Sequence, residues 1–317
     1  MGQRGNYIVK SEDSVNIHYT HWRANTIVHD LLIGPRKFLK FINEFELKDQ
    51  IISEPWIEGC VLIDTKKQLL IFWEHEHLHE LTVRNKYLNH LSEIWEGWEI
   101  RYAIHEMFDI ESELNVSYTS KQETNFDKEI NLDKLLIEDQ NEHVWCHVII
   151  KENEKFSLKK VYSGSDEELV LAGNQIVDIL KTKTSFPLPK ESDLNAWDLI
   201  LIDCDNKRLF INQSITGLKE ELQRLNLWSG WEITLGNFGY LGLLQIFVYD
   251  VESLKISEPE ARKRISEMEN HQDNFDPIKL AEKLQKQSND IEFHPNYFEN
   301  IKRPKKSFFE KLKGLFK

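Results

Sequence analysis

Hydrophobic and polar positions alternate along the first 110 residues in a way that predicts both strands and helices. Short apolar runs at 7–10 and 15–19 flank a polar turn and predict a hairpin, and a second hairpin is expected from 60–64 and 68–73. Apolar residues recur at helical spacing after Pro35 and again over 81–94. With a strand at 98–104, the expected order is β-β-α-β-β-α-β, which is typical of an α+β fold.

The same pattern returns in the second half of the chain. The sequence Ile94-Trp95-Glu96-Gly97-Trp98-Glu99-Ile100 reappears in outline at 227–233, and further blocks match at offsets of 133 to 141 residues. A matched order of blocks over about 110 residues predicts a tandem duplication. We therefore expect one α+β repeat at 1–112 and another at 144–254, with Gly97 ending a helix in the left-handed conformation. Large rings at matched places favour the core, and this applies to Trp56, Trp95, Trp98, Trp197, Trp228 and Trp231.

Three segments lie outside the two repeats. Residues 113–143 are polar and acidic and are expected to form a linker with one short helix near 132–137. Residues 255–300 are expected to form a helical extension, with helices at 259–270 and 277–288. Residues 301–317 are basic, and a predicted helix there has one apolar face, made of Phe308, Phe309, Leu312, Leu315 and Phe316. This composition is typical of a helix that lies on a membrane surface or binds a partner.

Composition narrows the classes of function. The formal net charge is −13, which argues against non-specific nucleic-acid binding and is compatible with a cationic protein partner. The three cysteines are isolated, no apolar run opens the chain, and no stretch is long enough to span a membrane. We expect a reduced, cytoplasmic protein, with the basic tail as a candidate contact to the inner face of the membrane.

One motif carries recognisable chemistry. His75, Glu76 and His79 satisfy the pattern H-E-x-x-H, in which two histidines on one helix face bind zinc and the glutamate activates a water molecule. His77, His90 or Glu80 could supply a third ligand. The second repeat has no metal-binding side chains at the matched positions, and a solvated loop between strand and helix is the alternative interpretation.

A second cluster occurs only in the first repeat. It contains His18, His21, Arg23, Asn25, His29 and Asp30, whereas the matched positions of the second repeat carry other residue types. If the hairpins are neighbours, this loop, residues 74–80 and His105-Glu106 would approach one another and form a polar pocket. Arg23 would suit an anionic group. Drift of a loop sequence after duplication is the alternative.

The N-terminal sequence also carries a family resemblance. Residues 1–4 with Asn6, then 19–22 and 30–35, resemble the start of an uncharacterised bacterial protein family, and the Gly97-Trp98 motif extends the likeness. The resemblance implies a bacterial origin and supplies no activity.

Taken together, these patterns favour a non-enzymatic, intracellular protein-binding module, for example an immunity-type protein that neutralises a toxin, or a regulatory protein. A zinc-dependent hydrolase using His75, Glu76 and His79 is the first alternative. A peripheral membrane adaptor that binds through its tail is the second. The hydrolase requires the motif on a helix with a third ligand within about 2.0–2.2 Å of the metal.

Overall fold

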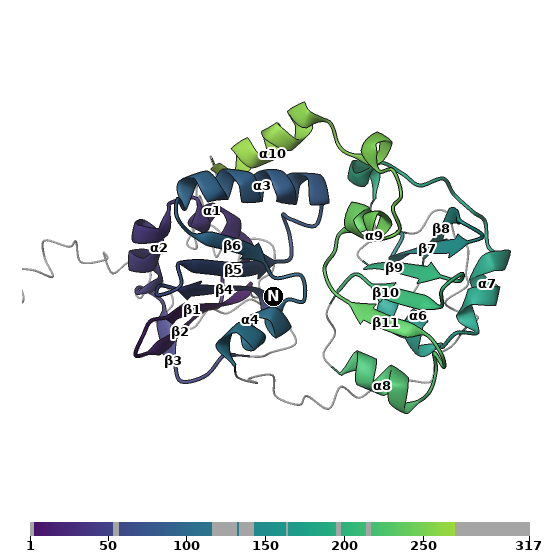
Figure 1. Ribbon diagram of the computed structural model, residues 1–317, viewed down its shortest axis with the longest axis horizontal. Coiled ribbons are helices and arrows are strands. Elements are labelled where there is room, and N and C mark those ends of the chain that lie inside the picture. Colours follow the sequence, from purple (N-terminus) through teal and green to yellow (C-terminus); the bar gives the residue numbers. More distant parts are fainter. Residues whose placement is uncertain are drawn as a thin grey trace, which may run out of the picture. The chain divides into compact units, whose positions relative to one another are not determined.

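Two mixed β-sheets with helices make up the described part of the protein, as seen in a computed structural model (Figure 1). The structure describes residues 3–52, 57–115, 132, 143–162, 164–194, 198–213 and 217–269. Both sheets lie within one compact unit, Met1–Glu269. The α+β class is therefore confirmed. The predicted apolar tail face, the helix expected at 277–288 and two of the tryptophans, Trp56 and Trp197, lie outside the described residues.

The first sheet has the strand order β3-β2-β1-β4-β5-β6. Its half of the chain contains β1 (Arg4–Lys10), β2 (Val15–Thr20), η1 (Ala24–Thr26), α1 (Ile27–Leu31), α2 (Pro35–Ile42), β3 (Glu46–Lys48), β4 (Ile57–Asp64), β5 (Leu69–Glu74), α3 (Leu81–Ile94), β6 (Glu99–Tyr102) and α4 (Met107–Leu114). All the predicted elements are present, and α1, β3 and α4 are additional.

The second sheet has the order β11-β10-β9-β7-β8. Its half contains β7 (Cys146–Glu152), β8 (Lys155–Val161), α6 (Asp166–Leu171), α7 (Ile176–Thr182), η2 (Glu191–Asp193), β9 (Asp198–Asp203), β10 (Arg208–Ile211), α8 (Leu218–Arg224), β11 (Glu232–Leu235), α9 (Tyr240–Ile246) and η3 (Glu252–Leu254). The helix α10 (Glu258–Glu269) follows.

Strand register supports the proposed duplication. β3 is additional in the first sheet, and the other strands pair in the same way in both sheets. The pairs β1–β2 and β7–β8 are antiparallel, and the pairs β1–β4 and β7–β9 are parallel. The pairs β4–β5 and β9–β10 are antiparallel, and the pairs β5–β6 and β10–β11 are parallel. Partner residues also correspond: Tyr7–His18 with Val148–Lys159, Tyr7–Val61 with Val148–Ile200, Leu62–Ile71 with Leu201–Phe210, and Leu70–Ile100 with Leu209–Ile233. A one-residue slip would reverse the two faces of a strand, so matched register preserves the core of each repeat.

Both faces of each sheet are covered by helices. Val61 and Ile63 of β4 contact the core under α1, α2 and α3, whereas Cys60 and Leu62 face the core beside α4 (Figure 1). In the second sheet α6, α7 and α8 cover one face and α9 covers the other. Burial on both faces explains why the central strands are continuous apolar runs instead of alternating patterns.

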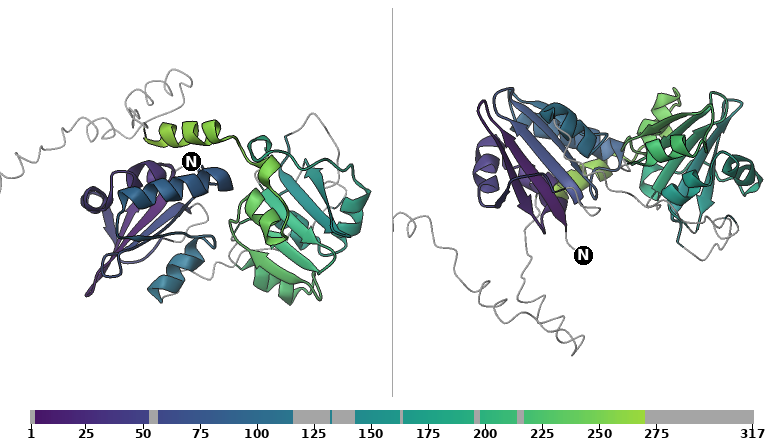
Figure 2. Two further views of the ribbon diagram at one scale, coloured as in Figure 1. Left: turned by 45° about the horizontal axis from the view of Figure 1, so that its top comes forward. Right: turned by 90° about the horizontal axis from the view of Figure 1, so that it is seen from below.

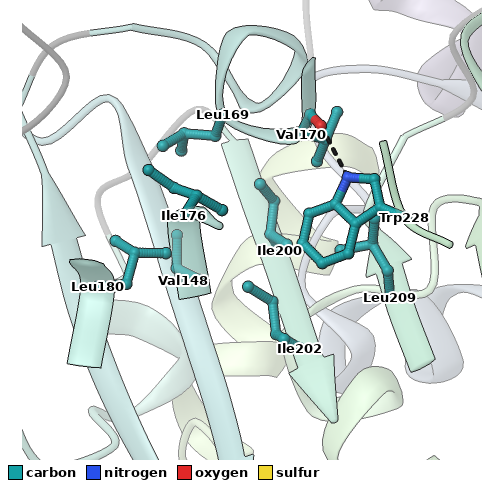
Figure 3. A pocket seen from close by; sticks show the side chains of 9 residues that line it. All are labelled: Val148, Leu169, Val170, Ile176, Leu180, Ile200, Ile202, Leu209 and Trp228. Atoms are coloured by element: carbon teal, nitrogen blue, oxygen red, sulfur yellow. Dashed lines mark hydrogen bonds between the residues drawn. The ribbon is translucent and has the colours of Figure 1, made fainter. Parts of the chain in front are cut away.

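A tryptophan seals the same corner in each repeat. The indole Nε1 of buried Trp95 donates to Leu31 O at 2.8 Å, and that of Trp228 donates to Val170 O at 2.7 Å (Figure 3). The space beneath Trp228 is apolar and has no room for a water molecule. Trp98 and Trp231 stack edge-on against these rings, each pair at 5.1 Å. Gly97 and Gly230 lie between the two tryptophans of each pair and have φ of +82° and +76°. The left-handed conformation predicted for Gly97 is therefore present, but α3 already ends at Ile94 and α8 at Arg224.

The helix after the second repeat completes the core of the first. Ala261, Ile265 and Met268 of α10 are buried in the same cluster as Phe72 and Leu91. Helix α10 runs beside α3 (Figures 1 and 2), where His90 Nε2 lies 2.7 Å from a Glu269 oxygen. The first of the two predicted extension helices is therefore an integral layer of the first repeat.

Candidate functional site

Five strand ends meet at one edge of the first sheet. Because β1 pairs parallel with β4 and antiparallel with β2, and β4 pairs antiparallel with β5, the starts of β1 and β4 lie beside the ends of β2 and β5. The end of β6 joins them through its parallel pairing with β5. We call this the loop edge. It brings together the two loops that the sequence singled out, residues 20–26 and 74–80.

A buried glutamate organises the second of these loops. Glu74 accepts backbone N–H groups from Glu76 at 2.9 Å, His77 at 2.9 Å and Leu78 at 2.7 Å, and its carboxylate lies 3.1 Å from His77 Nδ1. Burial alone would raise the pKa of Glu74, but the His77 hydrogen bond and charge, with the backbone donors, lower it. Burial alone would lower the pKa of His77, but Glu74 raises it. Glu74 and His77 therefore hold the loop in shape.

The H-E-x-x-H motif lies in this loop and not on a helix. Helix α3 begins at Leu81, after the motif has ended, and His79 Nδ1 lies 3.1 Å from Glu76 O. Two histidines on one helix face, the arrangement that the hydrolase prediction requires, are therefore not formed. Among the residues that the structure describes, no three histidines, cysteines or acids are grouped as a metal site.

The predicted binding residues of the first repeat occupy different environments. His29 meets the other loop: its ring contacts His77 edge-on at 5.2 Å, and its Nδ1 lies 2.7 Å from Met268 O of α10. His18 is buried in β2, where burial lowers its pKa. Asn25 lies in η1 with its Oδ1 buried. The structure thus brings His29 and His77 together and places His18 in the strand.

Arg23 forms an ion pair inside the protein. Its guanidinium nitrogens Nη2 and Nε lie 2.8 and 3.3 Å from the Asp30 carboxylate, which also accepts a hydrogen bond from Thr26 Oγ1 at 2.9 Å. The guanidinium also lies over the Phe41 ring at 5.0 Å. Binding an anionic ligand would require Arg23 to exchange these contacts, so Arg23 functions here in fixing η1 and α1.

An exposed tryptophan at the loop edge was not singled out from the sequence. Trp22 is 60% exposed, yet its backbone is fixed. Gln3 N donates to His21 O at 2.8 Å, and Ala24 N donates to Gln3 O at 3.0 Å, so Gln3 lies alongside Trp22 as a β-bridge. The Trp22 ring stacks edge-on with His21 at 4.6 Å. The sequence does contain a sign of this exposed residue: Trp22 lies in a polar loop, and the matched position of the second repeat is Ser163, not a tryptophan.

Two acidic residues share this region. Gln3 Nε2 donates to Glu76 Oε1 at 3.4 Å, which connects Glu76 to the segment beside Trp22. Glu58 is the second residue of β4. Burial, followed by the negative charge of Glu76, raises the pKa of Glu58, whereas His75, the N-terminal amino group and Arg4 act in the opposite direction. We name Gln3, His21, Trp22, Glu58 and Glu76 the Trp22 surface.

The matched edge of the second repeat has different chemistry. Gln213 occupies the position of Glu74 and donates its amide to a buried carboxylate, Asp166. The Asp166 backbone N–H donates to Asp198 at 2.9 Å. Burial, and then the charge of Asp198, raises the pKa of Asp166 to about 7. The two repeats therefore share a fold but not a polar site.

A separate cleft of about 490 Å³ is lined by residues of α3, α9 and the segment 252–258. Its charged side chains pair with other residues: Lys255 lies 2.5 Å from Glu252, and Glu258 lies 2.5 Å from Lys86. None of the predicted site residues lines this cleft.

Comparison with models of protein families, with curated proteins and with solved structures gave no match. Within the described residues, no helix is long and apolar enough to cross a membrane.

Proposed function

We propose that this protein binds another protein, without catalysing a reaction, through the Trp22 surface. The observation that carries the proposal is Trp22, a large aromatic side chain that is exposed although its backbone is held by Gln3. Burying such a ring in an interface contributes about 2–3 kcal/mol. Because its backbone is already ordered, little conformational entropy is lost on binding.

The composition of the surface supports a protein interface. Tryptophan is enriched among the residues that dominate binding energy, and such residues are surrounded by polar groups that exclude water. His21, Gln3 and Glu76 form such a polar surround.

The side chains that could take part in catalysis are engaged in contacts within the protein, which favours binding over catalysis. Glu74 and His77 hold the loop, and Arg23 and Asp30 fix the helix that follows. Their strongest contacts are internal. Neutralisation of a toxin is one form that such binding takes.

The proposal is tested by capturing partners on immobilised full-length protein from a lysate of the cells that make it. We expect Trp22→Ala to lose at least about tenfold in affinity for the captured protein, because the central aromatic anchor is removed. Trp145→Ala is the matched control, since Trp145 is 49% exposed but lies at the start of the second sheet. Equal retention of the same protein by wild type and Trp22→Ala would refute the proposal.

A further inference from the structure

We propose that Asp166 and Asp198 form a proton-operated switch, which holds one proton in mildly acidic solution and loosens the start of α6 when that proton leaves. The switch belongs to the second repeat and does not depend on the Trp22 surface. Three features carry it: the burial of Asp166, the negative charge beside it, and the position of both residues where α6 meets β9.

Asp166 is buried although it carries a carboxyl group. Only 1% of the residue is exposed, and its two oxygens accept hydrogen bonds from the Glu167 N–H at 2.7 Å and from the Gln213 amide. An ionised carboxylate can accept about four hydrogen bonds. Within the described residues, no lysine or arginine forms an ion pair with Asp166. Removing a charge from water is costly without such a partner, so the site favours the protonated form.

A second carboxyl group lies next to the first. The Asp166 N–H donates to Asp198 at 2.9 Å. Burial, then the charge of Asp198, raises the pKa of Asp166 to about 7, whereas the Gln213 amide and the Glu167 N–H act in the opposite direction. Burial also raises the pKa of Asp198, against the Asp166 N–H and the charge of His75. The two carboxyl groups therefore ionise together only in alkaline solution.

The neighbouring elements do not direct a compensating cation at the pair within the described residues. On β7, the titratable neighbour is the Cys146 thiol, whose pKa is raised by burial and then by the charges of Asp166 and Asp198. The charged side chains of the helices and strands around α6 are exposed or engaged elsewhere: Lys219, Glu220, Glu221 with Arg224, Asp178, Lys181 with Glu152, Arg208 with Asp203, Lys159 with Lys183 O, and Lys160 over the Phe186 ring.

Loss of the proton acts on the start of α6. Asp166 is the first residue of α6 and Asp198 is the first residue of β9, so two ionised carboxylates repel each other across the contact between helix and strand. Helix α6 also carries Val170, whose carbonyl accepts the indole N–H of Trp228 at 2.7 Å (Figure 3). A movement of the helix therefore reaches the indole, which can report it.

The experiment is a pH titration of ¹³C,¹⁵N-labelled full-length protein by NMR between pH 5 and 9. Asp166→Asn assigns the Asp166 carboxyl signal, and Trp228→Phe assigns the Trp228 indole N–H signal. We expect the Asp166 carboxyl to titrate near pH 7 and the Trp228 signal of wild type to move with the same midpoint. In Asp166→Asn the Trp228 signal should no longer move in this range, because the amide cannot ionise. Asp198→Asn should lower the midpoint of Asp166 by about one pH unit, because a neighbouring negative charge is removed.

Asp178→Asn is the matched control, since Asp178 is an exposed aspartate of α7, and it should leave both titrations unchanged. An Asp166 carboxyl already ionised at pH 5, or a midpoint that Asp198→Asn does not lower, would overturn the shared proton. A Trp228 signal that stays still while Asp166 titrates, or that moves equally in Asp166→Asn, would overturn the switch. If Asp166→Asn does not fold, sequential assignment identifies the Asp166 carboxyl, and wild type with Asp198→Asn decides the outcome.

Discussion

At the scale of single residues, Glu74 shows how one position separates the two repeats. Its carboxylate accepts three backbone N–H groups and pairs with His77, whereas Gln213 at the matched position donates to Asp166. A carboxylate accepts hydrogen bonds with both oxygens, while an amide offers only one acceptor. The shape of the loop between β5 and α3, and so the position of Glu76, depends on this difference.

Replacing Glu74 by Gln should therefore lower the free energy of unfolding by about 1–3 kcal/mol, because buried donors lose an acceptor.

The pH dependence of the free energy of unfolding gives a sharper test of the Glu74–His77 pair. The lowered pKa of Glu74 means that its contribution is lost as pH falls below about 4.5, and the raised pKa of His77 means that its contribution is lost as pH rises above about 6.5. Urea denaturation of wild type between pH 4 and 8 should show this window, and Glu74→Gln should flatten it. Glu96→Gln, on an exposed site, should keep it; a flat wild-type profile would contradict the assignment.

At the scale of elements, the tryptophan corner is a unit that occurs twice. In each repeat the indole of a tryptophan that follows one helix donates to a carbonyl of another helix, and its ring packs against a second tryptophan just before the next strand. The hydrogen bond satisfies a buried carbonyl, and the ring fills a corner that smaller side chains would leave open.

Trp95→Phe and Trp228→Phe should each destabilise the protein by about 2–3 kcal/mol, through a lost hydrogen bond and a small cavity. Thermal unfolding of the single variants measures this. Trp145→Phe, at an exposed position, is the control and should change stability by less than about 0.5 kcal/mol. A loss of stability in only one of the two variants would show that Trp95 and Trp228 do not stabilise their repeats in the same way.

The sequence predicted most of the fold because similar patterns of apolar and polar positions occur in both halves of the chain. The strands of both hairpins, helix α3 and Gly97 were all found this way. Helices α1, α4, α6 and α9 were missed, since each has at most eight residues and so repeats its apolar positions over only about two turns. The sequence placed loops 20–26 and 74–80 near each other, and both lie at the loop edge of the first sheet. The candidate site residues, which were chosen from the sequence for their chemistry, were mostly titratable side chains. Arg23 and His77 proved to be paired inside the protein, whereas Trp22, an aromatic residue, is exposed.

At the scale of the whole molecule, α10 shows that the first repeat needs residues from beyond the second repeat to complete its core. The first repeat is not closed by its own residues, because Ala261, Ile265 and Met268 supply part of its core. The boundary at 112 inferred from sequence matching therefore marks the duplicated pattern and not a complete folding unit.

Two truncations test this directly. A chain of residues 1–269 keeps α10, and a chain of residues 1–257 lacks it. The shorter chain should be less stable by about 3–6 kcal/mol, from the lost burial of one alanine and two large apolar side chains. Urea midpoints measure the difference, and the longer chain controls for removal of 270–317. Equal midpoints would show that α10 does not contribute to the core.

The return of α10 to the first repeat also has a consequence for synthesis. The ribosome releases the second repeat up to Leu254 before it releases Met268, so the half of the protein that is made first is completed last. At typical translation rates, roughly 8–30 s separate the end of α4 from the end of α10. During this interval the nascent first repeat exposes the apolar surface that Ala261, Ile265 and Met268 later cover.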